Sequence, residues 1–320
     1  MPSTPPPAPA AAVAPASPTV AGPPPHGTPL TAWLLLVLLA CIWGTSFILM
    51  KKGLVVFSAM ELGATRVTVA ALLLLPFALK HVRQVEGSRI KWLLLSGIIG
   101  TFIPAFLFAY AETKLASGLA GVLNALTVAF TLLVGAVFFG QRITWLRAVG
   151  IAAGLLGTVV LILGGSGGEA TPSGEGNAWY GLYIVLATFG YGVSINVIKS
   201  KFHGMTSMAV TSVLLLFIGG PALLYLLLFT DFVYKLQHTS GAWEAFGYIV
   251  LLATMSTAVA MVLFNKLIQQ STALFASSNT YLVPVVALGW GLLDGEVINA
   301  WHLLGMGIIL LSVFIINRAK

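Results

Sequence analysis

Residues 107–154, LFAYAETKLASGLAGVLNALTVAFTLLVGAVFFGQRITWLRAVGIAAG, decide the fold, because the pattern recurs without a gap 155 positions later. The second copy, residues 262–309, reads VLFNKLIQQSTALFASSNTYLVPVVALGWGLLDGEVINAWHLLGMGII. Nearer the N-terminus, Trp43-Gly44-Thr45-Ser46 falls on Tyr191-Gly192-Val193-Ser194 at an offset of 148. The chain therefore contains two copies of one unit, each about half of its length.

Both copies are almost entirely apolar. Hydrophobic residues make up 58% of the chain and charged residues 8%, whereas a soluble domain carries about 25% charged residues. Continuous apolar runs of about 18–24 residues, long enough to cross ~30 Å of hydrocarbon as a helix, lie at 30–50, 59–79, 92–110, 117–139, 145–164, 178–198, 206–229, 243–265, 273–293 and 300–317. Continuous rather than alternating runs favour helices over a barrel. The sequence predicts an all-α integral membrane protein with ten transmembrane helices.

Other features exclude further classes. The net charge of +7 is spread over short loops, without a basic stripe or interleaved aromatics, so we expect no nucleic-acid partner. Cys41 is the single cysteine, which leaves no disulfide within the chain. Residues 1–29 hold 11 of the 16 prolines and no Lys or Arg. This composition predicts a disordered tail rather than a cleaved signal peptide.

The distribution of Lys and Arg predicts the orientation of the helices. With both termini in the cytoplasm, 11 of these residues fall in inner segments and 4 in outer ones, although Lys51 and Lys52 on the outer side go against the trend. An excess of cations on the cytoplasmic side is typical of membrane proteins. We therefore expect a multi-pass protein of the cell (inner) membrane with both ends in the cytoplasm.

The helix count also predicts an inverted repeat. The first copy, 30–164, and the second, 178–317, each hold five helices, an odd number, so the second begins on the opposite side of the membrane. Residues 165–177 are rich in glycine and lack Lys and Arg, which suits an external linker, and 318–320 form the cytoplasmic C-terminus. Two inverted halves around a central cavity can exchange roles by rocking, which gives alternating access. Transport is the favoured function, and a duplicated bundle with a purely structural role is the alternative.

Several short motifs resemble those of one family. They are Trp43-Gly44-Thr45-Ser46-Phe47 near the end of the first helix, Arg66 in the second, and Pro284 followed by Leu293-Asp294-Gly295-Glu296. In this order and spacing the chain resembles the EamA-type drug/metabolite transporters with two EamA domains, over residues 32–317. The resemblance implies ten helices around a cavity lined by helices 1, 3, 4, 6, 8 and 9. Many members of that family export amino acids or other small metabolites.

Three positions depart from the family pattern. Ala129 stands where the first copy often has proline, so we expect the fourth helix to lack the kink that Pro284 gives the ninth. Gln141 stands in place of the glutamate that Glu296 supplies in the second copy, and Tyr191 replaces a tryptophan. These departures leave the fold prediction intact. They weaken any inference of the substrate from other members of the family.

Arg66 is the most informative candidate for function. It lies about seven residues into its helix, and a cation at mid-membrane costs about 2.5–3.5 kcal/mol on insertion scales, so we expect a partner. Glu112, at the end of the third helix, is better placed than Glu61, which lies about 140° away around the helix of Arg66. Two roles stay open for Arg66: a structural or gating ion pair, and contact with the substrate.

Other residues are candidates for the cavity wall. The repeat partners Asn124 and Asn279 either bind neighbouring helices or line the cavity. Aromatic candidates, with an interfacial belt as the alternative role, are Trp43, Tyr110, Tyr191 and Tyr281. Side chains able to bind a substrate or a neighbouring backbone are Ser46, Ser194, Asn196 and Asn265. Residues expected to kink the third and ninth helices are Pro104 and Pro284.

Gly150, Gly154 and Gly157 form a face of small residues on the fifth helix. Packing within its own half is the favoured role of this face, and a homodimer contact is the alternative.

The sequence contains no convincing enzyme motif. The five histidines lack metal-ligand spacing and no phosphate-binding loop with lysine is present, so we expect no metal, no cofactor and no direct use of ATP. The favoured partners are the lipid bilayer and a small neutral or zwitterionic, amino-acid-like solute that is exported. Alternatives are drugs, nucleotide-linked or anionic metabolites, and, outside transport, a membrane-embedded enzyme or scaffold. For coupling we favour uniport or exchange over proton antiport, for which Glu61 and Glu112 are the candidate titrating groups.

Overall fold

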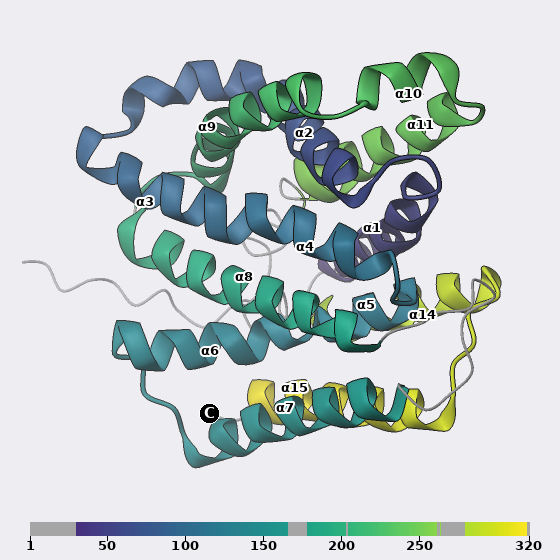
Figure 1. The fold of residues 1–320 in the computed structure, drawn as a ribbon. Coiled ribbons are helices and arrows are strands. Elements are labelled where there is room, and N and C mark those ends of the chain that lie inside the picture. The colour runs from purple at the N-terminus through teal and green to yellow at the C-terminus, as the bar shows by residue number, and fades with distance from the viewer. Residues whose placement is uncertain (1–29, 166–177, 203, 261–262, 264–278, 319–320) are drawn as a thin grey trace, which may run out of the picture.

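The computed structural model describes residues 30–165, 178–202, 204–260, 263 and 279–318. Within these ranges the chain forms helices joined by short connections, without a strand (Figure 1). The predicted tail, nearly all of the predicted linker, and Asn265 lie outside the described residues.

The elements follow one another along the chain in a single order. They are α1 (Leu30–Gly53), α2 (Ala59–His81), η1 (Val82–Gln84), α3 (Gly87–Gly97), η2 (Ile98–Phe102), α4 (Ile103–Glu112), α5 (Ser117–Leu123), α6 (Leu126–Phe139), α7 (Trp145–Gly165), η3 (Ala178–Tyr180), α8 (Gly181–Lys201), α9 (Ser207–Leu228), α10 (Phe232–His238), α11 (Ala242–Ala253), η4 (Thr254–Val259), α14 (Asn279–Leu293) and α15 (Ala300–Arg318). Two of these, η2 and η4, are π-helical, and η1 and η3 are 3₁₀ segments.

Eight helical stretches of the described chain are long and apolar enough to cross a membrane. Two further apolar helices, Leu282–Leu293 and Ala300–Ile316, are shorter. The all-α membrane fold is therefore confirmed, and the count of ten spans stays a prediction.

Two spans contain π-helical segments at corresponding places of the two copies. Segment η2 lies in the third span of the first copy, and η4 lies in the third span of the second. Pro104 follows η2 in the first turn of α4, where its missing N–H and its ring disturb the α-helical hydrogen bonds. The segment η4 forms without a proline, so the irregularity belongs to the repeated unit rather than to Pro104 alone.

The fourth span is interrupted although it contains no proline. Its first part, α5, ends at Leu123, its second part, α6, begins at Leu126, and the N–H of Ala125 bonds to the carbonyl of Val122 at 3.0 Å. Asn124 and Ala125 nevertheless keep right-handed helical backbone angles, so the expectation that this helix lacks a kink stays a prediction. In contrast, Pro284 lies inside the continuous helix α14.

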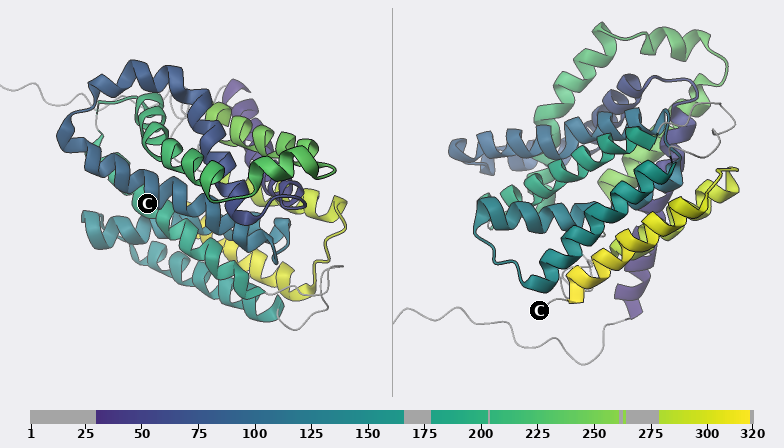
Figure 2. Two further views of the ribbon diagram at one scale, coloured as in Figure 1. Left: turned by 45° about the horizontal axis from the view of Figure 1, so that its top comes forward. Right: turned by 60° about the horizontal axis from the view of Figure 1, so that its bottom comes forward.

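Helices of one copy pack mainly on helices of the other. Helix α1 packs on α14, α8 on α6, α2 on α9, and α7 on α15. Helices α7 and α15 lie side by side in Figure 1 and Figure 2. The repeat partners Gly44 and Gly192 permit two of these contacts. A Cβ atom at Gly44 would lie 2.9 Å from the carbonyl oxygen of Val283, and one at Gly192 would lie 2.8 Å from the carbonyl carbon of Phe130. The largest cluster of buried apolar side chains also draws on both copies.

The glycine face of α7 packs on α15 of the second copy. Cβ atoms added at Gly150, Gly154 and Gly157 would meet atoms of α15, including Ser312 and Ile316. The prediction that this face packs within its own half was therefore wrong. Because α15 covers the three glycines, the same contact leaves this face no room for a second chain.

Candidate functional site

A cavity of about 870 Å³ lies inside the bundle. Its wall combines residues of α1, α2, η2 and α4 to α6 with residues of α8, η4 and α14, and α7, α9 and α15 add one residue each. This volume falls within the range of roughly 300–1,000 Å³ that is typical of small-molecule sites. The described wall carries the cations Arg66 and Arg147 and no Asp or Glu.

The structure brings many of the predicted site residues together in this wall. Those in the wall are Trp43, Ser46, Arg66, Asn124, Tyr191, Ser194, Asn279 and Pro284. Those that lie elsewhere are Tyr110, Glu112, Asn196 and Pro104. Asn265 is outside the described residues, as is the side chain of Tyr281.

Arg66 brings a guanidinium to the cavity. Within the described part of the chain it has neither an ion pair nor a hydrogen bond. Its expected partner, Glu112, is buried and accepts no hydrogen bond from a described residue. Glu61 instead pairs with Lys235 at 2.7 Å. A guanidinium without a protein partner is a strong donor for a carboxylate of a bound molecule.

Three buried polar atoms of the wall also lack a partner among the described residues. They are Thr127 Oγ1, Ser256 Oγ and Asn279 Oδ1. Buried polar atoms are normally hydrogen-bonded, so such atoms point to a ligand or to water. The sequence reasoning missed Thr127 and Ser256, because isolated hydroxyls in an apolar run carry no periodic signal. Ser256 in η4 and Thr101 in η2 are both polar wall residues on π-helical segments.

Two predicted wall residues bind backbone carbonyls at or near the π-helical segments. The indole N–H of Trp43 donates to the carbonyl oxygen of Ser256 at 3.0 Å. The hydroxyl of Ser194 donates to the carbonyl oxygen of Ser96 at 3.3 Å. Helix irregularities provide carbonyls for such bonds. The corresponding motifs of the two copies thus hold the irregular helices in place beside the cavity.

Two predicted residues contribute to structure outside the cavity. The ring of Tyr110 stacks on Tyr180, with centroids 5.5 Å apart, and is 42% exposed. The amide of Asn196 donates to the carbonyl oxygens of Thr131 and Gly192 at 2.8 Å each. Asn196 therefore links α8 to α6.

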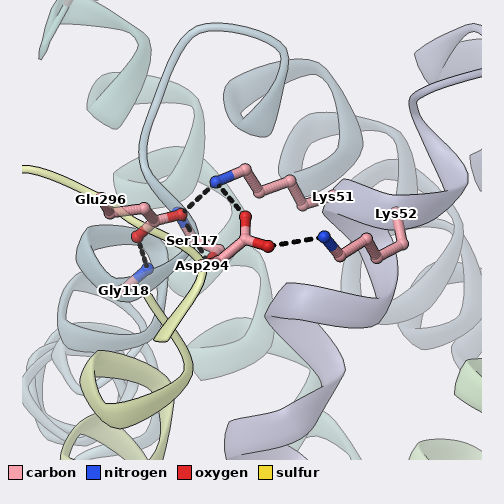
Figure 3. Close-up of polar contacts among 6 residues, drawn as sticks. All are labelled: Lys51, Lys52, Ser117, Gly118, Asp294 and Glu296. Carbon is pink, nitrogen blue, oxygen red and sulfur yellow. Dashed lines mark hydrogen bonds and ion pairs between the residues drawn. The ribbon is translucent and has the colours of Figure 1, made fainter. Parts of the chain in front are cut away.

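An ionic cluster lies outside the described cavity wall and joins three segments of the chain (Figure 3). We call it the Lys51 cluster; its members are Lys51, Lys52, Ser117, Gly118, Asp294 and Glu296. The Nζ atom of Lys51 lies 2.7 Å from Asp294 Oδ2 and 2.8 Å from Glu296 Oε1. The Nζ atom of Lys52 lies 2.5 Å from Asp294 Oδ1. These pairs join the end of α1 to the loop between α14 and α15.

Glu296 also joins this loop to the start of α5. Its Oε1 atom accepts from the backbone N–H and the hydroxyl of Ser117, both at 2.8 Å, and its Oε2 atom accepts from the N–H of Gly118 at 3.0 Å. Met50 and Gly121, which neighbour the cluster in sequence, line the cavity. The cluster therefore ties α1, α5 and the loop before α15 together at this end of the bundle, which we call the Lys51 end.

Both carboxylates of the cluster are stabilised in the ionised form. Burial by itself would raise the pKa of Glu296, but hydrogen bonds from Lys51, Gly118 and Ser117 outweigh it, so the pKa lies below its ordinary value. Burial likewise opposes hydrogen bonds from Lys51 and Lys52 at Asp294, whose pKa is also lowered. Across the described ranges, no three His, Cys, Asp or Glu side chains gather as a metal site would require.

The fold and the cavity define a multi-pass membrane protein of the transporter class. The model of the EamA-like transporter family matches residues 30–163 and again residues 178–318. The chain therefore belongs to the EamA-like transporter family, as the sequence motifs indicated.

Individual relatives agree with this assignment. The "Uncharacterized inner membrane transporter YedA" of Escherichia coli (strain K12) is 29% identical over 285 residues, which cover 87% of this chain and 88% of that protein. The "Probable terminal-alkyne amino-acid exporter" of Streptantibioticus cattleyicolor is 26% identical over 293 residues, 88% of this chain and 92% of that protein. A solved crystal structure with 19% identity matches the fold with a TM-score of 0.58, over 89% of this chain and 96% of the other.

Proposed function

We propose that the protein is a secondary transporter that exports a small neutral or zwitterionic, amino-acid-like metabolite by alternating access. The observation that carries the proposal is the cavity, which offers the guanidinium of Arg66 beside amide, hydroxyl and aromatic groups. Arg66 suits a carboxylate, whereas the oxygens of Asn124, Asn279 and Ser256 can accept from an ammonium group. The name of the Streptantibioticus relative, an amino-acid exporter, supports the same solute class.

Packing supports a repeat of five helices around a pseudo-two-fold axis. Under such symmetry each contact recurs with the two copies exchanged. The contact of α1 with α14 has its counterpart in α8 with α6, that of α1 with α11 in α8 with α3, and that of α2 with α11 in α9 with α3. An odd number of spans in each copy makes the copies inverted, which is the arrangement that alternating access uses.

We infer that both termini lie in the cytoplasm and that the Lys51 end faces outward. The inner segments then hold 11 Lys and Arg residues and the outer segments 4, in agreement with the positive-inside rule. Of the outer lysines, Lys51 and Lys52 pair with carboxylates of the cluster, and Lys235 pairs with Glu61. Arg147, near the start of α7, lines the cavity away from the cluster. The described conformation is then closed to the outside.

The test is transport by the purified protein in proteoliposomes. Vesicles receive a uniformly ¹³C-labelled mixture of the twenty amino acids, and mass spectrometry identifies those that enter. Arg66→Lys should lower the uptake of the selected amino acids by about tenfold or more, because a lysine cannot make the bidentate contact. The matched control is Arg89→Lys, since Arg89 pairs with Glu86 away from the cavity. Uptake of no amino acid, or full activity of Arg66→Lys, would contradict the proposal.

A second candidate is a carrier of anionic metabolites. Arg66 lines the cavity without an ion pair among the described residues, and its guanidinium suits a phosphate or a second carboxylate as well as an amino acid. Adding labelled dicarboxylic acids and nucleotides to the same screen decides between the two, since the first candidate requires that amino acids enter in preference.

A further inference from the structure

Glu112, the last residue of α4, differs from Glu61, the other acid considered for proton coupling. It is 6% exposed, and neither of its side-chain oxygens has a hydrogen-bond partner within the described residues. Glu61 is 2% exposed, but it accepts from Lys235 and from the N–H of Ser58 at 2.7 Å each. Glu61 is thus satisfied by its surroundings, whereas Glu112 is a buried acid without a structural partner.

Glu112 is within electrostatic reach of both the cavity wall and the Lys51 cluster. Three charged groups act on it from other elements: Arg66 on α2, Lys51 on α1, and Glu296 in the loop before α15. Arg66 lines the cavity, and the other two belong to the cluster. Helix α8 and segment η3, which also pack on α4, contribute the tyrosines Tyr180, Tyr183 and Tyr191. Helix α5 contributes no titratable group.

The closed cluster uses the donors that Glu112 would need. Lys51 binds Asp294 and Glu296, and the N–H groups of Ser117 and Gly118 bind Glu296. An ionised carboxylate buried without a hydrogen bond is far more costly than a neutral acid in the same place. Glu112 is therefore held neutral as long as the Lys51 end is closed.

We propose that Glu112 is a proton-binding site that releases the transported solute from Arg66. While the Lys51 end is closed, the neutral acid leaves Arg66 to the carboxylate of the solute. When this end opens, water reaches Glu112, the proton passes from its carboxyl oxygen to water, and the new carboxylate competes with the solute for the guanidinium. Closing takes a proton back from the same side, so no proton crosses the membrane. The inference rests on the proposed function and adds the step that empties the site.

Proton release on opening makes the conformation depend on pH. If one proton leaves when the end opens, the ratio of open to closed protein rises about tenfold per pH unit over the range in which only the open state is ionised. A protein in which residue 112 cannot ionise has no such slope and stays closed. The slope is therefore the quantity to measure.

Distances between two spin labels across the Lys51 end measure this equilibrium without any solute. The labels are placed by Thr113→Cys and Val297→Cys, both exposed positions, in a Cys41→Ser background reconstituted in lipid nanodiscs. In the parent, the fraction with a lengthened distance should rise with pH. Glu112→Gln should abolish the rise, and Glu112→Asp, which keeps an ionisable group, should restore it. The matched control Glu61→Gln removes a buried carboxylate that has a partner, and it should leave the rise in place.

Two results overturn the proposal: an unchanged pH response in Glu112→Gln, or no response in the parent. The aspartate variant shows whether a missing response reflects lost ionisation or misfolding. Because the measurement uses no solute, it stands even if the labelled amino acids fail to enter proteoliposomes. Conversely, if amino acids enter while the fraction with a lengthened distance does not change with pH, the result would agree with the proposed function and contradict the role of Glu112.

Discussion

Replacing Glu296 by alanine tests how strongly the Lys51 cluster stabilises the fold. The change removes four hydrogen bonds of 2.8–3.0 Å and leaves the N–H groups of Ser117 and Gly118 without their acceptor. Removing one partner of a buried, hydrogen-bonded ion pair costs about 3–5 kcal/mol. Because Lys51 keeps Asp294 as a partner, we expect the lower end of this range, about 3 kcal/mol.

Thermal unfolding of the purified protein in detergent, followed by tryptophan fluorescence, measures the effect. Asp294→Ala is the matched control, since it also removes a carboxylate that binds Lys51. The side chain of Asp294 is 20% exposed and that of Glu296 is 3% exposed. A more exposed pair contributes about 0–1 kcal/mol. The midpoint should therefore fall by several degrees in Glu296→Ala and only slightly in Asp294→Ala.

The comparison also separates charge from shape. Glu296→Gln keeps an oxygen that can accept from Ser117 or Gly118 but loses the charge, so its midpoint should lie between those of the wild type and Glu296→Ala. A midpoint for Asp294→Ala as low as that of Glu296→Ala would refute the reasoning, because burial would then not decide the strength of the pair.

Three further outcomes are expected. The pKa of Glu296 is lowered by folding, so its stabilisation is fully present above the ordinary value of 4.5 and is lost as the pH falls below it; unfolding midpoints measured across this range should fall with acid in the wild type and less in Glu296→Gln. Gly192→Ala would place a Cβ 2.8 Å from the backbone of α6 and should destabilise the fold by about 1–3 kcal/mol. Gly220→Ala has open space around the new Cβ and should leave the stability unchanged, and thermal midpoints of the two variants measure the difference. Trp43→Phe removes the donor to the carbonyl of Ser256 and should destabilise by about 1–3 kcal/mol, with weaker amino-acid uptake in proteoliposomes.

The helices were predictable because apolar length alone requires them in a membrane, and the repeat was visible as an alignment. The breaks in the helices were not, because a π-helical turn changes the hydrogen-bond partners without changing hydropathy. The interruption at Asn124 and the segment η4 both occur without proline. The glycine face of α7 shows the same limit, since small residues announce a close contact but do not identify the helix that makes it.

For the candidate site, the sequence identified the charged and amide side chains in apolar helices, but it did not identify the residues that they bind. Arg66 and Asn279 stand out because charge and amide groups are costly in an apolar helix, and both line the cavity. Asn196 stands out for the same reason, yet it binds the backbone of α6. Ser256 has little cost in a helix, where its hydroxyl can bond locally, so it gave no signal on its own.

The two copies carry different polar residues in the loop that holds Glu296. Gly140 and Gly295 have positive φ angles of 65° and 79°, so the loop turns alike in both copies. The next residue is Glu296 in one and Gln141 in the other; Gln141 donates to Asn196 at 3.0 Å. A neutral hydrogen bond contributes about 0.5–1.5 kcal/mol, whereas a hydrogen bond to a charged group contributes about 1.5–3 kcal/mol. Under the proposed alternating access, a difference of 1.4 kcal/mol shifts the equilibrium between the two states about tenfold, so we expect the contacts of Glu296 to favour closure of the Lys51 end. If that end is external, as proposed, the resting protein keeps its cavity available to the cytoplasm, which is the state an exporter needs in order to load its solute.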